Sequence, residues 1–319
     1  MRIAQIHAVI LSAFVGLLGA NFSLAQNYPT KPIRIHTAGA GGTSDTVSRV
    51  LADDLAAALG QPLIVENFAG TVLVPNASKV APDGYTLLIT GNNLWVAPLF
   101  QEMPYNPIKD FTPIVTLTRQ STILVVHPSL PAKTVAELVK GAKNKPGELN
   151  YSSGTTGSSS QIAAELFNSL AGTNIIRVTY KATAQEMSDL LSGRIHLTFG
   201  NGPTMGPLVQ AGKVRALATA GSRRSVLFPD LPTIAETVPG YVSEQLVGIF
   251  VPAKTSDAIV RRINQVAVRA IEKSDIHDRL LKNGLEPVGG SPEQFLDAIK
   301  SDMVRIGRTI KDAGVRTGS

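Results

Sequence analysis

Residues 148–172 read ELNYSSGTTGSSSQIAAELFNSLAG, and residues 33–60 read IRIHTAGAGGTSDTVSRVLADDLAAALG. Each stretch begins with a short strand-like segment, continues into a loop of glycine and small polar residues, and ends in an amphipathic helix. In the later stretch every residue from 152 to 160 is Ser, Thr or Gly. An interdomain spacer would not lead at once into a strongly periodic helix. We therefore interpret these stretches as two matching strand–loop–helix units, one in each half of the molecule.

Both predicted helices show apolar residues at spacings of three and four, which is the pattern of one buried stripe. The first stripe comprises Val47, Val50, Leu51, Leu55 and Leu59, and the second comprises Ala163, Leu166, Phe167 and Leu170. Short apolar runs predict strands at 33–38, 62–67, 85–90, 174–180, 194–200 and 214–219. Alternating strands and helices favour an α/β fold with parallel sheets covered on both faces.

Two long β-rich stretches, 111–131 and 241–255, interrupt this alternation without an intervening helix. The segment between them has its own strands and helices, so we expect a second lobe inserted into the first. The predicted division is residues 26–122 and 247–319 for lobe 1 and residues 123–246 for lobe 2. After the second crossing we expect only helices, at 256–273 and 291–314, packed against lobe 1.

The N-terminus is typical of a secretory signal peptide. Arg2 precedes an apolar run from about Ala8 to Leu18, and Ser23 and Ala25 occupy the −3 and −1 positions of a cleavage site. We expect residues 1–25 to be removed near Ala25 and the mature protein to be exported. The alternative is an uncleaved anchor, although the apolar run is short for a membrane span. No later segment is apolar enough to cross a bilayer.

Composition excludes several classes of protein. The 30 Lys and Arg residues are spread among 24 Asp and Glu residues, so the net charge of +6 forms no basic block. An exported chain without basic or aromatic recognition motifs is not expected to bind nucleic acid. The chain contains no cysteine, so no disulfide holds the fold together.

The two loops have the chemistry of an anion-binding site. A Gly/Ser/Thr loop that opens a helix offers backbone N–H groups, short hydroxyls and the positive end of the helix dipole. Its small side chains allow a carboxylate or phosphate to approach the backbone closely. The alternative interpretation is helix capping, by Thr43 or Ser44 in the first unit and by Ser158 or Ser159 in the second.

Motifs for other chemistries are missing from the sequence. Neither loop is followed by the Gly-Lys-Ser/Thr of a nucleotide-triphosphate site, and the first loop lacks the third glycine of a dinucleotide fingerprint. The G-x-S-x-G motif of α/β-hydrolases is absent, and the five histidines never occur at H-x-x-x-H spacing. We therefore expect no metal and no cofactor. Trp95 either lines a cleft or, as is commoner for a single tryptophan, belongs to the core.

Taken together, the motifs identify a family resemblance. They are YPTKPIRI, GGTSD, LGQPLIVEN, APDGYTLL, NPIKDFTPI, HPSLPAKTVAEL, KPGELNYSSGTTGSS, FPDLPTIAE and EPVGGSPEQF, in this order. The chain resembles the periplasmic substrate-binding proteins of tripartite tricarboxylate transporters, the Bug family. The resemblance implies a periplasmic-binding-protein type II-like α/β fold, with two lobes joined by two crossing strands in a Venus-flytrap arrangement. It also implies capture of a carboxylated metabolite and delivery to membrane permease subunits.

The resemblance also implies which residues bind the ligand. In the family, one ligand carboxylate is typically bound by both the first-lobe loop and the second-lobe Ser/Gly/Thr loop. Carried onto this sequence, the ligand-binding residues are Gly41, Gly42, Thr43, Asp45, Thr90, Asn92, Ser153, Thr155, Gly157, Ser158, Ser159, Tyr180, Lys181, Gly200 and Asn201.

This sequence departs from the family pattern at several positions. HTAGA (36–40) replaces an aromatic residue and prolines, Ala182 follows Tyr180-Lys181 in place of glycine, and the family's Asp-x-x-x-Asp reads His196 and Gly200. The missing carboxylate at Gly200 predicts a roomier, less negative pocket. Our hypothesis is a ligand with a second carboxylate or an aromatic ring, without an amino group that needs an acidic partner. His196 is expected to be a hydrogen-bonded structural residue rather than a pH-sensitive ligand contact.

The sequence thus predicts a monomeric periplasmic solute-binding protein for a small organic carboxylate, without catalytic activity. One alternative is a periplasmic sensor whose closed form is read by a signalling kinase. The other is a periplasmic enzyme that uses the same cleft, but the loop serines have no obvious histidine partner to activate them.

Overall fold

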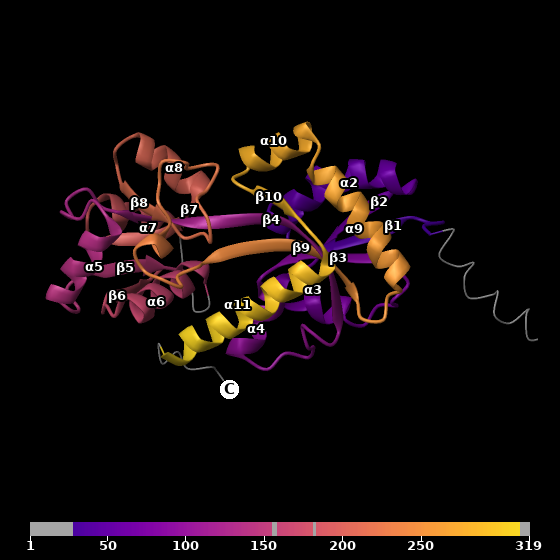
Figure 1. Cartoon of the computed structure of the whole chain (residues 1–319), viewed down its shortest axis with the longest axis horizontal. Coiled ribbons are helices and arrows are strands. Elements are labelled where there is room, and N and C mark those ends of the chain that lie inside the picture. The colour runs from indigo at the N-terminus through magenta and orange to yellow at the C-terminus, as the bar shows by residue number, and fades with distance from the viewer. Residues whose placement is uncertain (1–27, 155–157, 181–182, 313–319) are drawn as a thin grey trace, which may run out of the picture.

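A computed structural model describes residues 28–154, 158–180 and 183–312. Figure 1 shows two α/β halves at opposite ends of the long axis, joined by two long strands. We call the half that contains β1 to β3 lobe 1 and the half that contains β5 to β8 lobe 2. The predicted signal peptide lies outside the described residues.

Lobe 1 has helices on both sides of a mainly parallel sheet. Its strands are β1 (Ile33–Thr37), β2 (Leu63–Asn67), β3 (Thr86–Gly91) and β10 (Glu286–Gly289). Its helices are α2 (Thr43–Leu59), α3 (Gly70–Ala77), α4 (Asn93–Phe100), α9 (Asp257–Ile271), α10 (Ser274–Lys282) and α11 (Pro292–Asp312). β1 lies between β2 and β3 and pairs with both in parallel, as the strand–helix alternation predicts.

Lobe 2 repeats this arrangement on a smaller scale. Its strands are β5 (Asn150–Ser153), β6 (Ile176–Thr179), β7 (Leu197–Asn201) and β8 (Arg215–Thr219). Its helices are α5 (Val135–Asn144), α6 (Ser159–Ala171), α7 (Thr183–Leu191) and α8 (Gly202–Gln210), with a short 3₁₀ helix η1 at Ile234–Glu236. β5 lies between β6 and β7 and pairs with both in parallel.

The two lobes are joined by β4 (Phe111–Val126) and β9 (Glu244–Pro252), which run antiparallel to each other. β4 pairs with β9 as far as Ser121 and with β7 from Thr122 onward, so it passes from one sheet to the other between these residues. β9 pairs in addition with β3 from Val247. Two adjacent strands without a helix between them form a natural hinge for the lobes.

Each lobe has a hydrophobic core on both faces of its sheet. In lobe 1, the predicted stripe of α2 is buried, and Leu51 and Leu55 pack with Ile33 and Leu87 of the sheet. In lobe 2, Phe167 of α6 packs with Phe199 and Tyr241. Leu170, which the helical spacing placed on the same stripe, is 41% exposed, because it lies near the end of α6 at the surface.

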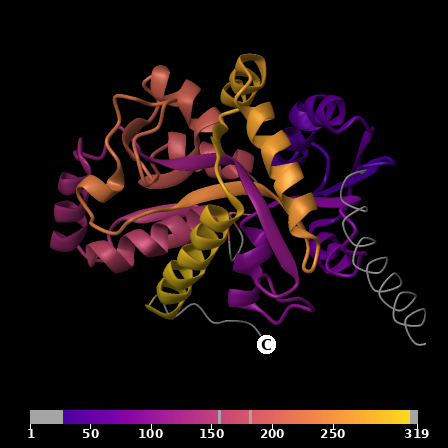
Figure 2. The ribbon, with the colours of Figure 1, turned by 45° about the vertical axis from the view of Figure 1, so that its right-hand side comes forward.

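The C-terminal region differs from the sequence prediction. Besides α9, α10 and α11 it contains the strand β10, which pairs antiparallel with β4 at Glu286 and Gly289. This strand has four residues, one of them proline, and lacks an apolar alternation, so its pairing depends on β4 rather than on its own pattern. α11 then extends from lobe 1 and contacts α6 of lobe 2 (Figure 2). Within the residues that the structure describes, no helix is both long and apolar enough to cross a bilayer.

Candidate functional site

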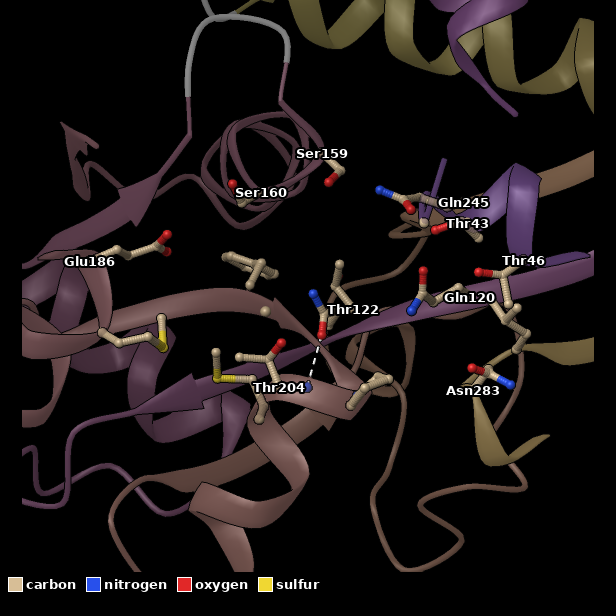
Figure 3. A pocket seen from close by; sticks show the side chains of 18 residues that line it. Thr43, Thr46, Gln120, Thr122, Ser159, Ser160, Glu186, Thr204, Gln245 and Asn283 are labelled. Carbon is tan, nitrogen blue, oxygen red and sulfur yellow. Dashed lines mark hydrogen bonds between the residues drawn. The ribbon is translucent and has the colours of Figure 1, made fainter. Parts of the chain in front are cut away.

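Two adjoining cavities lie between the lobes, with volumes of about 460 Å³ and 390 Å³. The larger one, shown in Figure 3, is bounded by α2, β7, α7, α8 and the α10–β10 connection. The smaller one is bounded by β3, α4, α6, β9 and α11. Thr43, Ser159 and Gln245 line both cavities. The cleft is therefore continuous, and both Gly/Ser/Thr loops lead into it.

The first loop follows β1 and opens α2. Gly41 has φ of +80°, a conformation that favours glycine, and its N–H donates to Asp45 Oδ2 at 2.9 Å. The N-cap of α2 is Gly42, and no side chain caps the helix. Capping by Thr43 or Ser44 is thus wrong for this unit, and the start of α2 at the cleft has no side-chain cap.

Asp45 is buried beneath this loop and lines neither cavity. Its carboxylate accepts hydrogen bonds from Arg49 Nε at 3.0 Å and from Asn67 Nδ2 at 2.8 Å. Burial by itself raises the pKa of Asp45, but the hydrogen bonds from Arg49, Asn67 and Gly41 and the charge of Arg49 outweigh it, so the pKa lies below its ordinary value. These contacts support a role for Asp45 in holding the loop rather than in touching a ligand.

The second loop follows β5 and opens α6. Ser158 is the N-cap, and its hydroxyl accepts from Gln161 N at 3.4 Å, so the capping interpretation is confirmed for Ser158. Ser159 and Ser160, in the first turn, line the larger cavity. Ser153 is buried at the end of β5, where its hydroxyl accepts from Arg177 Nε at 2.7 Å. Hydroxyls of the first helical turn therefore face the cleft, while Ser153 supports the loop from below.

The remaining predicted residues differ in their positions. Asn201 caps α8 by accepting from Thr204 N at 2.9 Å, and it lines the larger cavity. Tyr180 lines neither cavity, and its hydroxyl donates to Asp189 Oδ2 at 2.8 Å. Burial and this neighbouring carboxylate raise the pKa of Tyr180 to about 12.

Thr90 and Asn92 line the smaller cavity at the end of β3. The side chain of Asn92 is already engaged with β9, since it donates to Glu244 O at 3.0 Å and accepts from Leu246 N at 2.6 Å. It also donates to Asp302 Oδ2, whose pKa is raised by burial. Asn92 thus attaches lobe 1 to a crossing strand.

The predicted site residues fall into four groups by position. Gly41, Gly200 and Asn201 line the larger cavity, Thr90, Asn92 and Ser158 line the smaller one, Thr43 and Ser159 line both, and Gly42, Asp45, Ser153 and Tyr180 line neither. Thr155, Gly157 and Lys181 lie outside the described residues.

The structure corrects the expectation of a roomier, less negative pocket at Gly200. A Cβ at this position would lie 2.5 Å from Cγ of Met205, so the side chain of Met205 already fills that space. A carboxylate is present elsewhere in the same cavity, on Glu186 of α7. The sequence could not reveal these two positions, because Met205 lies against Gly200 and Glu186 enters the cavity lining only through the packing of α8 and α7 in the folded lobe.

Sequence reasoning missed several lining residues. They are Thr46, Gln120, Thr122, Ser160, Glu186, Met187, Phe199, Pro203, Thr204, Met205, Gln245, Asn283 and Leu285. Gln120 and Gln245 had a partial signal, because each lies in a short polar stretch of a predicted crossing region, TRQST at 118–122 and SEQ at 243–245. The structure pairs the two residues in register. Asn283 and Leu285 had none, because they come from the α10–β10 connection, far along the chain.

Two expected structural residues are confirmed. Trp95 is fully buried in the lobe 1 core, packs against Phe250 and Phe295, and donates from Nε1 to Asp302 Oδ2 at 2.7 Å. His196 lines neither cavity, and its Nδ1 lies 2.9 Å from Asn150 Oδ1. Burial and the nearby His127 lower the pKa of His196.

A buried ion cluster joins the crossing strands beside the cleft. Arg119 of β4 lies 3.6 Å from Glu244 of β9 and 3.1 Å from Glu286 of β10. The same glutamates accept hydrogen bonds from Ser222 and Ser225 of lobe 2. The cluster thus connects the crossing strands β4 and β9 and the strand β10 to lobe 2 through ion pairs and hydrogen bonds. Among the residues that the structure describes, no group of three or more His, Cys, Asp or Glu side chains is arranged to hold a metal ion.

Two α/β lobes, two crossing strands and a polar cleft between helix N-termini define the class of two-lobed solute-binding proteins. A family model described as "Tripartite tricarboxylate transporter family receptor" matches residues 47–315. The chain belongs to this family. It is a binding protein of the periplasmic type II fold and not an enzyme, as the sequence resemblance implied.

The relatives agree with this assignment. The chain is 30% identical over 325 residues to Protein BugT of Bordetella pertussis, with 99% of each chain covered. It is similar to a solved structure described as R. palustris Rpa4515 with adipate, at 33% identity and a TM-score of 0.72, covering 90% of this chain and 98% of that one. It is also similar to the structure of MatC from Rhodopseudomonas palustris with bound malate, at 28% identity and a TM-score of 0.68, covering 89% of this chain and 100% of that one.

Proposed function

We propose that this protein captures a small organic carboxylate, of the dicarboxylate or aromatic class, in the cleft between its lobes. The observation that carries the proposal is that Thr43 at the start of α2 and Ser159 at the start of α6 line the same two cavities. Both helices direct the positive ends of their dipoles to this cleft, which favours an anion. Two similar structures contain adipate and malate, both of which are dicarboxylates.

Binding is proposed to select a closed arrangement of the lobes. A carboxylate bridged between the starts of α2 and α6 makes contacts with both lobes, and these contacts are weaker when the lobes are apart. The crossing strands β4 and β9 are the hinge. The lobe division proposed from the sequence, 26–122 with 247–319 and 123–246, is supported by the change of sheet at Ser121 and Thr122 of β4.

The bound carboxylate is proposed to be delivered to the membrane permease subunits of a tripartite transporter. This role follows from the family and requires an exported chain, so we propose cleavage of the signal peptide near Ala25. The proposed working form is a periplasmic monomer that does not bind nucleic acid. Of the predicted contact residues, Thr155, Gly157 and Lys181 are retained as part of the proposed site.

A thermal-shift screen of the protein without residues 1–25 tests the ligand class. The panel contains mono-, di- and tricarboxylates, aromatic acids, amino acids and sugars. A ligand at about 100 times its Kd is expected to stabilise the fold by about 2.7 kcal/mol, and only carboxylates are expected to do so. Shifts with sugars alone, or with no compound, contradict the proposal.

Variants then locate the site. The double variant Thr43→Ala/Ser159→Ala is expected to weaken the best carboxylate at least tenfold, because it removes one hydroxyl from each lobe. Ser192→Ala is the matched control, since Ser192 is exposed and bonds only within its own helix end. Equal affinities of the two variants would place the ligand elsewhere.

A further inference from the structure

The larger cavity contains one ionisable side chain among the described residues that line it, and this is Glu186 of α7. Its other lining groups are hydroxyls, amides, backbone and apolar side chains. In Figure 3 the carboxylate of Glu186 points from the lobe 2 wall toward the interior of the cavity. Thr46, Gln120 and Asn283 lie at the opposite, lobe 1 end.

The lobe 2 core positions this carboxylate. Oε1 of Glu186 accepts from Ser152 Oγ at 2.8 Å and from Thr198 Oγ1 at 3.3 Å. Ser152 and Thr198 are fully buried on the neighbouring strands β5 and β7. A carboxylate held by two buried hydroxyls loses little freedom when it meets a ligand, so its direction is set in advance.

Glu186 also differs from the carboxylates of the crossing region. Glu244 and Glu286 each form an ion pair with Arg119, whereas no Lys, Arg or His of the described residues forms an ion pair with Glu186. A carboxylate has about four acceptor sites, and the hydroxyls of Ser152 and Thr198 use two. The remaining acceptor capacity faces the cavity.

A second polar group that lines this cavity lacks a partner among the described residues. Thr122 of β4 is 7% exposed, lines this cavity, and its Oγ1 has no hydrogen-bond partner within the described residues. Buried hydroxyls are rarely left without a partner in folded proteins. The unpaired hydroxyl and the acceptor side of Glu186 together indicate that a polar ligand completes the lining of this cavity.

We infer that Glu186 is a specificity-determining residue that selects carboxylates bearing a hydrogen-bond donor, either an ammonium or a hydroxyl group. The inference rests on the proposed function, since the ligand carboxylate is taken to lie at the starts of α2 and α6. The donor substituent then points to Glu186. A second carboxylate, where present, lies against the amides of Gln120 and Asn283, because near Glu186 it would meet a like charge. This replaces the hypothesis of a ligand without an amino group.

Calorimetric titration with matched ligand sets tests the inference. Each set shares a carbon skeleton and differs only in the donor: succinate, malate and aspartate; adipate and 2-aminoadipate; and 3-methylbenzoate with 3-(hydroxymethyl)benzoate and 3-(aminomethyl)benzoate. The wild-type protein is expected to bind the donor-bearing members of at least one set about tenfold or more tightly than the parent acid. Equal or tighter binding of the parent acids in every set overturns the inference.

The variant Glu186→Gln identifies the residue responsible. It keeps the size of the side chain and removes its charge, so the preference for ammonium is expected to fall by about tenfold or more. The hydroxyl preference falls less, because the Gln carbonyl still accepts. Glu148→Gln is the control for charge, since Glu148 is exposed and pairs with Lys145 outside the cleft. A preference for the ammonium-bearing ligands that survives unchanged in Glu186→Gln overturns the inference.

The outcomes separate the two proposals. If no acid of any set binds, the proposed function fails and the inference fails with it. If the parent acids bind as well as the donor-bearing ones, the proposed function stands and the inference alone fails. If the melting curve shows that Glu186→Gln does not fold, the comparison of matched ligands on the wild-type protein still tests the inference.

Discussion

The two strand–loop–helix units look alike in sequence but are held together differently. The first loop is organised by Asp45, which accepts from Gly41 N, and by the left-handed backbone of Gly41. The second loop is organised by the Ser158 cap and by Arg177 of β6, which donates to Ser153 Oγ and to Gly154 O. The same sequence pattern thus gives the same strand–loop–helix topology, but different hydrogen bonds hold the two loops in place. These hydrogen bonds decide which loop hydroxyls are engaged with the protein and which can contact a ligand.

The largest effect that separates the two units is expected from Asp45→Ala. This change leaves Arg49, Asn67 and Gly41 N without their shared acceptor beneath the first loop, and it is expected to lower the free energy of unfolding by about 2–3 kcal/mol. Asp53→Ala, on the exposed face of the same helix, is the control and is expected to change it by less than about 0.5 kcal/mol. Urea unfolding measures both. Similar values for the two variants contradict the proposed support.

The pH dependence of stability provides a second test of the role of Asp45 in the first loop. The pKa of Asp45 in the folded protein lies below its ordinary value of 3.8. Its contribution to stability is therefore fully present above that value and is lost as the pH falls through the lower folded pKa. The stability difference between the wild type and Asp45→Asn is expected to be constant from neutral pH down to about 4 and to shrink below it. Denaturant titrations at a series of pH values measure this difference. A difference that grows on acidification contradicts this sign.

Gly41→Ala tests the backbone of the first loop. A Cβ at Gly41 meets no atom within 4 Å, so the cost comes only from its φ of +80° and is expected to be about 1–2 kcal/mol. Gly39→Ala is the matched control, because it also meets nothing within 4 Å and lacks a positive φ. Thermal unfolding of both variants measures the difference. Equal melting temperatures would show that the loop relaxes without the left-handed residue.

The smallest effect compares the two helix starts directly. Ser158→Ala removes the N-cap of α6 and is expected to cost about 1 kcal/mol. Thr43→Ala removes a hydroxyl that caps nothing and is expected to cost less than about 0.5 kcal/mol. Chemical denaturation of the ligand-free protein measures both. A larger loss for Thr43→Ala would mean that the first helix depends on this hydroxyl after all.

The supports of the two loops were only partly predictable from the sequence. The small residues and the helix stripes are local patterns, so the existence and order of both units were predicted. The partners Asn67 and Arg177 belong to neighbouring strands, β2 and β6, and reach the loops only through the parallel pairing of the sheets. For that reason Asp45 and Ser153 were expected to contact the ligand, whereas their side chains are engaged with the protein.

The lining of the cleft was likewise only partly predictable from the sequence. Gly200 was correctly placed at the end of a strand that faces the cleft, but the space beside it depends on Met205 of α8. The sequence analysis did not single out Glu186, which is one acidic residue between the strands predicted at 174–180 and 194–200. Its position in the cavity results from the packing of α7 over β5 and β7 and from hydrogen bonds to Ser152 and Thr198.

The sequence by itself determined the α/β class, the two matched units, the two crossing strands and the family. These properties follow from hydrophobic periodicity and from short motifs, which act over neighbouring residues. Only the tertiary structure decided which hydroxyls cap, which carboxylates are paired and which one faces the cavity. These properties depend on contacts between residues far apart in the chain. One such contact can engage a side chain with the protein, so that a residue expected to bind the ligand instead holds a loop in place.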